Sequence, residues 1–208
     1  MGQINNLVSV IRDVPFRTCR RLIAVSGPPA SGKSTYAGVL AAQTKNAVVV
    51  PMDGFHLENE ILKQRGLLER KGAPETFDVD GFVHLIKRLS TDDEIYFPLF
   101  DRERDCAVAG AGYVGADCET VIVEGNYLML DEPKWRDLAM LWDYSITLEV
   151  PHTMLRARLL DRWSRYGFDS AEAIAKTDGN DLPNVNRVLR NHIASDMNIK
   201  NVSQTDLQ

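Results

Sequence analysis

The sequence has few cysteines and no long apolar run, and each of these shortages argues against a class of protein. Its three cysteines, Cys19, Cys106 and Cys118, are an odd number without regular spacing. This pattern argues against a disulfide scaffold and a cysteine zinc site, and it indicates a reducing compartment. The apolar residues between positions 4 and 11 are too few and too interrupted for a signal peptide or a membrane helix. We therefore expect a cytoplasmic protein without a membrane partner.

The sequence also lacks an excess of positive charge. The net charge is −5 and the isoelectric point is near 5.4, whereas a nucleic-acid binder usually carries a basic footprint. We therefore expect no nucleic-acid partner, although a local basic cleft for phosphate groups is compatible with this balance. The chain has 208 residues, enough to bury about 70% of its unfolded surface. We expect a single domain over residues 1–208, with at most a small lid.

One glycine-rich stretch carries most of the chemical information. Residues 27–34, Gly-Pro-Pro-Ala-Ser-Gly-Lys-Ser, fit the phosphate-binding pattern G-x-x-x-x-G-K-[ST]. Its glycines let the backbone turn sharply and approach a triphosphate, and its N–H groups point at the anion together with the N-terminus of the next helix. Lys33 is expected to reach the β- and γ-phosphates and the Ser34 hydroxyl to ligate Mg²⁺. The expected nucleotide-binding residues are Gly27, Ala30, Ser31, Gly32, Lys33, Ser34 and Thr35.

Apolar runs alternate with helical patterns along the rest of the chain. We expect strands at residues 21–26, 46–52, 119–124, 143–150 and 197–202, and helices at residues 5–13, 35–44, 57–66, 80–89, 151–166, 169–176 and 184–195. Asp80 is expected to cap the helix that ends at Leu89. Such alternation predicts a three-layer α/β/α fold with a mainly parallel five-stranded sheet, which binds ligands at the carboxyl ends of its strands.

The region of residues 94–115 does not follow this alternation. Residues 94–100 are extended but contain Pro98, which predicts an edge strand or an excursion from the sheet. Residues 106–115 are rich in glycine, alanine and valine, and they predict a short hairpin. We therefore expect residues 94–115 to form an excursion on the substrate side.

Two carboxylates directly follow expected strands. Asp53 follows the run from Val48 to Met52, and Glu124 follows Val121-Ile122-Val123. Glu124 stands where a P-loop protein places the acid that helps to hold Mg²⁺. Asp53 could accept the proton of an attacking hydroxyl group. The alternative for either acid is that it only caps the loop after its strand.

Charged side chains in two further segments could complete a site. Arg158, Arg162 and Arg165 are spaced three and four residues apart, on one face of the helix at residues 151–166. This lid-bearing face could close over the γ-phosphate, or it could be a solvated surface, and Trp163 is expected to pack. The charged run at residues 101–105 could equally line a substrate pocket or lie on the surface. His56, three residues after Asp53, could touch the substrate.

Several segments in this order resemble one family. They are Met52-Asp53-Gly54-Phe55-His56, Arg65-Gly66, Lys71-Gly72-Ala73-Pro74-Glu75-Thr76-Phe77-Asp78, Pro98-Leu99-Phe100-Asp101-Arg102 and Val123-Glu124-Gly125-Asn126-Tyr127. They resemble the P-loop kinases that include pantothenate kinase, uridine kinase and phosphoribulokinase, closest to the branch labelled fructose transport system kinase. The resemblance covers roughly residues 21–191.

The resemblance implies a P-loop NTPase fold and a kinase that uses ATP and Mg²⁺ to phosphorylate an alcohol group of a small molecule. It implies catalytic roles for Lys33, Asp53, Arg158 and Arg162, metal binding by Ser34 and Glu124, and part of an adenine pocket near Asn184 and Asn186. Substrate contacts are implied for Asp53, His56, Phe77, Phe100, Asp101, Arg102 and Tyr127. Relatives of this kind are often dimers, so a homodimer is compatible with the resemblance.

The acceptor does not follow from the resemblance. The segment after Pro98 lacks the tyrosine- and histidine-bearing pattern of pantothenate and uridine kinases. The pair of Asp101 and Arg102 could serve a polyhydroxylated or an anionic acceptor. Two alternatives to a kinase stay open: a nucleotide-binding regulator, although the chain lacks the Asn/Thr-Lys-x-Asp segment that GTPases use for guanine, and an NTP hydrolase.

Overall fold

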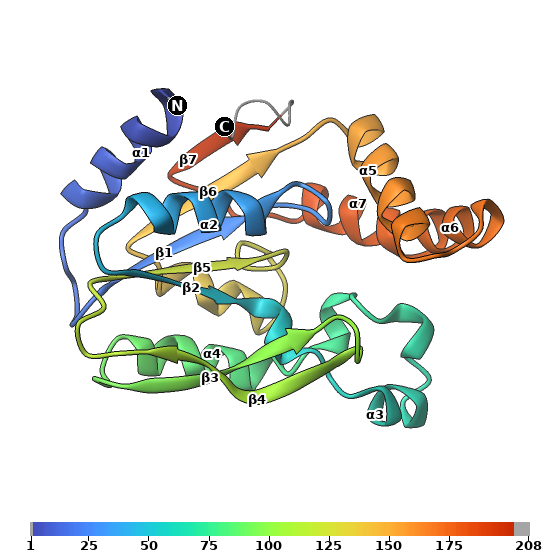
Figure 1. The fold of residues 1–208 in the computed structure, drawn as a ribbon, viewed down its shortest axis with the longest axis horizontal. Helices are drawn as coiled ribbons and strands as arrows, with labels where there is room; N and C mark the ends of the chain where they lie inside the picture. Colours follow the sequence, from blue (N-terminus) through green and yellow to red (C-terminus); the bar gives the residue numbers. More distant parts are fainter. Residues whose placement is uncertain (1, 202–208) are drawn as a thin grey trace.

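The computed structural model describes residues 2–201 and is built around a parallel five-stranded sheet (Figure 1). The strand order is β2-β5-β1-β6-β7, and all four neighbouring pairs are parallel. The strands are β1 (Arg21–Ser26), β2 (Ala47–Pro51), β5 (Thr120–Gly125), β6 (Tyr144–Glu149) and β7 (Met197–Lys200). The expected sheet is thus confirmed. Val202, the expected end of the last strand, lies outside the described residues.

Helices cover both faces of the sheet because its central strands are apolar on both faces. Alternate residues of β1 point to opposite sides: Ile23 and Val25 pack with helices α1 (Gly2–Asp13) and α2 (Lys33–Gln43), whereas Leu22 and Ala24 pack with α4 (Val79–Leu89). This double burial explains the continuous apolar run of the strand. The three-layer α/β/α arrangement is therefore confirmed.

Residues 94–115 form a separate two-stranded antiparallel sheet beside the main one (Figure 1). Its strands are β3 (Ile95–Asp101) and β4 (Cys106–Val114), and their register is interrupted between Phe97 and Leu99, around Pro98. The expectation of a short hairpin within residues 106–115 is wrong, because this segment is one strand of a longer hairpin. Its turn lies at the charged residues between β3 and β4.

The expected cap of α4 also needs correction. Asp78, not Asp80, accepts a hydrogen bond from the backbone N–H of Gly81 at 2.9 Å and caps the helix. Asp80 lies in the first turn and forms an ion pair with Lys134. Two aspartates stand two residues apart at the start of this helix, and both residue types suit its N-terminus, so the sequence alone does not decide which one caps it.

The carboxyl ends of β1, β2, β5 and β6 point toward a group of helices on one side of the molecule (Figure 1). This group holds α3 (Asn59–Gln64), α5 (His152–Arg165), α6 (Ser170–Lys176) and α7 (Leu182–Arg190). A π-helical turn, Thr177–Asp181, joins α6 to α7 without a break. The last helix therefore begins earlier and ends earlier than expected, at Arg190 and not at Ser195. Within residues 2–201 no helix is long and apolar enough to cross a membrane.

Candidate active site

The phosphate-binding loop has the backbone that its glycines allow. Gly32 lies at φ +89°, in the left-handed region, and a Cβ there would stand 2.8 Å from the Asn201 side-chain nitrogen. A Cβ on Gly27 would stand 2.8 Å from the Ser31 hydroxyl oxygen. Both glycines also have a positive φ, which L side chains rarely adopt, so both ends of the loop favour glycine.

The loop is braced by its own residues and by the last strand. The Lys33 ammonium donates to the Pro28 carbonyl at 3.0 Å, and the side-chain amide of Asn201, which follows β7, donates to the Ser31 carbonyl at 2.7 Å. Lys33 is buried, and burial lowers the pKa of Lys33 to about 8, because removal from water disfavours the ammonium charge, while Glu124 and Asp53 act in the opposite direction. The site therefore concentrates a positive charge beside the loop N–H groups, as phosphate binding requires.

Glu124 and Asp53 lie at the same edge of the sheet because their strands are neighbours. In the register of β2 and β5, Pro51 pairs with Glu124, so Asp53 stands just beyond the paired ends. The Ser34 hydroxyl donates to Glu124 Oε1 at 2.8 Å. Burial raises the pKa of Glu124, although Lys33 opposes the shift. A hydroxyl and a carboxylate oxygen held together in this way suit a hard cation such as Mg²⁺.

Asp53 is also held by an arginine from the turn between β3 and β4. Arg102 Nη2 donates to Asp53 Oδ2 at 2.8 Å, with the two side chains 49% and 26% exposed. The structure thus brings Arg102 to the strand ends from 49 positions further along the chain.

Two cavities meet at this ion pair. The smaller one, about 200 Å³, is lined by the phosphate loop and Glu124. The larger one, about 970 Å³, is lined by His56, Phe100 and residues of α5 to α7. Both cavities share Pro29, Asp53, Arg102, Asn126 and Arg162. The Asp53 carboxylate therefore stands between a phosphate-binding space and a second space large enough for a metabolite.

His56 forms part of the wall of the larger cavity. Its ring stacks on Phe77 with 4.0 Å between centroids and is tilted against Phe100 at 4.9 Å. Burial lowers the pKa of His56 to about 4, so the imidazole is neutral near pH 7. Its Nδ1 atom is buried and has no hydrogen-bond partner among the described residues. The wall is therefore apolar and uncharged at this point, with hydrogen-bonding capacity in the ring.

The arginines of α5 do not all lie at the two cavities. Arg162 lines both cavities. Arg158 lines neither of them and donates to the backbone carbonyls of Ala30 at 3.3 Å and Asn201 at 3.4 Å. Arg165 is exposed and pairs with Asp161. Trp163 packs against Tyr166 and Phe168, as expected, but it also lines the larger cavity.

Some residues expected at the substrate or nucleotide lie elsewhere. Phe77 and Tyr127 are buried beneath the larger cavity and do not line it. Asp101 Oδ1 accepts from the N–H groups of Glu103 and Arg104 at 3.0 Å and shapes the turn between β3 and β4. Asn184 lines the larger cavity with His56, and Asn186 lines neither cavity.

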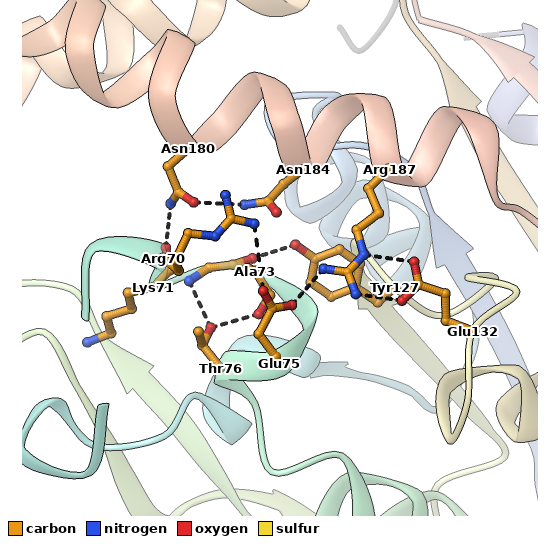
Figure 2. A network of polar contacts seen from close by, with 11 residues as sticks. Arg70, Lys71, Ala73, Glu75, Thr76, Tyr127, Glu132, Asn180, Asn184 and Arg187 are labelled. Carbon is orange, nitrogen blue, oxygen red and sulfur yellow. Dashed lines mark hydrogen bonds and ion pairs between the residues drawn. The ribbon is translucent and has the colours of Figure 1, made fainter. Parts of the chain in front are cut away.

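A polar network that the sequence analysis missed holds residues 70–76 under the larger cavity. Figure 2 shows this segment lying between α7 and Tyr127. Arg187 of α7 donates to Glu75 at 2.6 Å and to Glu132 at 2.6 and 2.7 Å, and the Tyr127 hydroxyl donates to the Gly72 carbonyl. Arg187 and Glu75 are 112 positions apart, and no local pattern signals the contact. Asn201 could have been found, because it directly follows a parallel strand.

Comparison with known proteins identifies close relatives of this chain. A Schizosaccharomyces pombe protein provisionally named a uridine kinase is 36% identical over 192 residues, which cover 86% of this chain and 82% of that protein. The uncharacterized Escherichia coli protein YggC is 40% identical over 181 residues, covering 83% and 74% of the two chains. No family model matches the chain.

Solved structures agree with this picture. A crystal structure from Silicibacter sp. TM1040, of a protein provisionally called a fructose transport system kinase, superimposes with a TM-score of 0.91 at 46% identity. The match covers 94% of this chain and 98% of that one. Phosphoribulokinase from Rhodobacter spheroides shares the fold, with a TM-score of 0.57 at 15% identity over 91% of this chain and 72% of that one.

Proposed function

This chain belongs to the P-loop kinase family that includes uridine kinase and pantothenate kinase, and we propose that it transfers the γ-phosphoryl group of ATP, with Mg²⁺, to an alcohol group of a small metabolite. Its kinase relatives support a phosphotransferase over a nucleotide-binding regulator. The observation that carries the proposal is the position of Asp53, at the junction of the phosphate-loop cavity and the larger cavity.

The smaller cavity is the proposed donor side. The loop N–H groups and the Lys33 ammonium bind the β- and γ-phosphates, and Arg162 neutralises charge that develops on the transferred group. Ser34 Oγ and Glu124 Oε1, 2.8 Å apart, would hold Mg²⁺ directly or through its waters. Mg-ATP would supply the phosphoryl group, and its cation would offset the charge of the phosphate oxygens.

Arg158 is proposed to support the nucleotide from a different position. Its guanidinium lies between the carbonyls of Ala30 in the phosphate loop and Asn201 after β7. A planar cation beside this loop can stack on a base or contact a ribose, but it does not reach the junction at Asp53. We therefore assign it to nucleotide binding, and Arg162 alone to the reacting phosphate.

The larger cavity is the proposed acceptor side. Asp53 accepts the proton of the attacking hydroxyl group while the hydroxyl oxygen bonds to the γ-phosphorus. The neutral His56 ring, the ring of Phe100 and the amide of Asn184 line this cavity together with charged residues of both signs. This combination supports a sugar, nucleoside or pantothenate-like alcohol as the acceptor class.

The test is ADP release with Mg-ATP against a panel of acceptors: fructose and other sugars, pentose phosphates, uridine, cytidine, pantothenate and glycerate. One acceptor should stimulate ADP release strongly. Asp53→Asn should lower that turnover by about 10² or more, with Mg-ATP affinity kept within a few-fold. Unchanged turnover in the Asp53→Asn variant would remove Asp53 from the assigned role.

A further inference from the structure

We propose that Arg102 is a specificity-determining residue that keeps Asp53 from activating water, and that Lys71 is a positioning residue that holds Arg102 in place. The inference rests on the proposed kinase function, because it concerns the choice between two acceptors of the same phosphoryl group. Water is present in every kinase site, and a kinase must transfer to its acceptor without hydrolysing ATP.

The first observation is that Arg102 binds the Asp53 carboxylate at the junction of the two cavities. The guanidinium donates to Asp53 Oδ2 at 2.8 Å, and both side chains line both cavities. An acceptor hydroxyl that bonds to Oδ2 from the larger cavity therefore competes with Arg102 for that oxygen. The bound guanidinium also lowers the tendency of the carboxylate to accept a proton, so the ion pair disfavours activation of any hydroxyl group, including that of water.

The second observation is that the turn carrying Arg102 is fixed by Lys71. The Lys71 ammonium donates to Asn59 Oδ1 at 2.7 Å, to the Asp105 carbonyl at 2.8 Å and to Asp105 Oδ2 at 2.9 Å. These three bonds use all three N–H donors of the ammonium group. Although Lys71 lines the larger cavity, its side chain is only 14% exposed and has no donor left for a ligand.

The backbone of Lys71 is fixed as well. The side-chain amide of Asn180, in the π-helical turn, donates to the Lys71 carbonyl at 2.9 Å, and Tyr127 holds the neighbouring Gly72 carbonyl (Figure 2). Lys71 therefore links a rigid segment under the larger cavity to the turn between β3 and β4. The turn cannot drift away from Asp53 unless the Lys71 contacts break.

Because the turn is held in this way, the ion pair between Arg102 and Asp53 should be more stable than an ordinary surface pair. Exposed pairs are weak largely because two flexible side chains lose entropy when they meet. Here Lys71 and Asp101 hold the backbone of the turn that carries Arg102. Less conformational entropy is therefore lost when the ion pair forms. An acceptor that fills the larger cavity gains enough contacts to offset displacement of Arg102, whereas a water molecule gains almost none.

The chemical step is the same for both acceptors. The attacking oxygen bonds to the γ-phosphorus, the bond to the β–γ bridging oxygen breaks, its electron pair leaves on ADP, and the proton of the attacking hydroxyl passes to Asp53. With a metabolite the products are ADP and a phosphate ester. With water they are ADP and inorganic phosphate, so hydrolysis reports directly on how freely Asp53 meets water.

The experiment measures ADP release from Mg-ATP without any added acceptor, together with Mg-ATP affinity and thermal unfolding for each variant. Arg102→Gln should raise ADP release about fivefold, the range of a strong exposed ion pair. Lys71→Met and Asp105→Asn should each raise it about twofold, because the turn loosens but Arg102 remains. Arg104→Gln is the matched control in the same turn; its side chain is 69% exposed and lines neither cavity, and it should leave the rate unchanged.

The double variant Asp53→Asn with Arg102→Gln should lose the gain, because the gain depends on the Asp53 carboxylate. An unchanged or lower rate in Arg102→Gln, with Mg-ATP affinity retained, would overturn the inference, and so would a gain that survives in the double variant. If Lys71→Met fails to fold, Asp105→Asn tests the same contact. Absence of Mg-ATP binding by the unsubstituted protein would overturn the proposed function itself. Failure of the inference alone would leave this binding intact.

Discussion

The phosphate loop and the hairpin of β3 and β4 meet at Asp53, but they depend on local contacts to different degrees. The loop has a contact within its own motif, since Lys33 bonds to Pro28 five positions away, and Asn201 braces it from 170 positions along the chain. On the hairpin side the contacts are distant: Arg102 reaches Asp53 across 49 positions, and Asn180 reaches Lys71 across 109. The loop motif is thus readable in one short segment, whereas the contacts of the hairpin with Asp53 and Lys71 depend on the assembled fold.

The largest effect on turnover should come from a substitution within the phosphate loop. Lys33→Met removes the buried charge that faces the phosphates, and we expect turnover to fall by about a thousandfold. The measurement is acceptor-stimulated ADP release, with nucleotide affinity measured in parallel. Lys45→Met is a matched control, because Lys45 is exposed and pairs only with Glu119 at the surface. Near-normal turnover in Lys33→Met would contradict the donor-side assignment.

The next effect concerns His56, on the boundary between the two regions. Burial lowers the pKa of His56 to about 4 in the folded protein, from its ordinary value of 6.5. Between these values the unfolded chain binds a proton that the folded protein does not, so the free energy of unfolding falls as the pH is lowered from about 6.5 toward 4. At pH 5, titration of His56 should lower the free energy of unfolding by about 2 kcal/mol relative to pH 7.

Denaturant unfolding at pH 7 and pH 5 measures this loss. His56→Phe keeps a ring against Phe77 and removes the titrating group, so its stability should depend less on pH than that of the unsubstituted protein. An equal loss of stability in both proteins would show that other groups carry the acid sensitivity.

The smallest effect should come from the contacts that Arg187 makes with residues far away in the sequence. Arg187→Met removes the ion pairs to Glu75 and Glu132 that hold residues 70–76. These partly exposed charge-assisted bonds should contribute about 1 to 2 kcal/mol to the free energy of unfolding. Acceptor KM should rise while Mg-ATP affinity stays the same, because only the larger cavity loses support. Arg190→Met, on the exposed end of α7, is the control; equal effects of both variants on KM would contradict the role assigned to Arg187.

The same contrast explains what the sequence could and could not predict. The phosphate loop, the parallel strands and the two acids at their ends are predicted, because each depends on a local pattern or on the rule that ligands lie at strand carboxyl ends. The hairpin was misplaced because its pairing depends on strand register, which residues 106–115 do not encode alone.

Other misses also come from contacts that no spacing reveals. The role of Lys71 depends on Asp105 and Asn59, which are close only after the hairpin has folded over α3. The π-helical turn before α7 sets the directions of the later side chains and places Asn184 at the larger cavity, and its contact with the nucleotide stays a prediction. One extra residue in a helical turn rotates every later side chain, and sequence periodicity does not show it.

The hydrogen bond from Asn201 to Ser31 has a consequence for how the protein is made. The two residues are 170 positions apart, so the ribosome completes the phosphate loop long before it synthesises the residue that braces it. During synthesis the nascent chain holds an unbraced loop until β7 joins the edge of the sheet. The brace of the loop is therefore added late, after the residues that line both cavities have been synthesised, and a chain broken off before β7 would lack it.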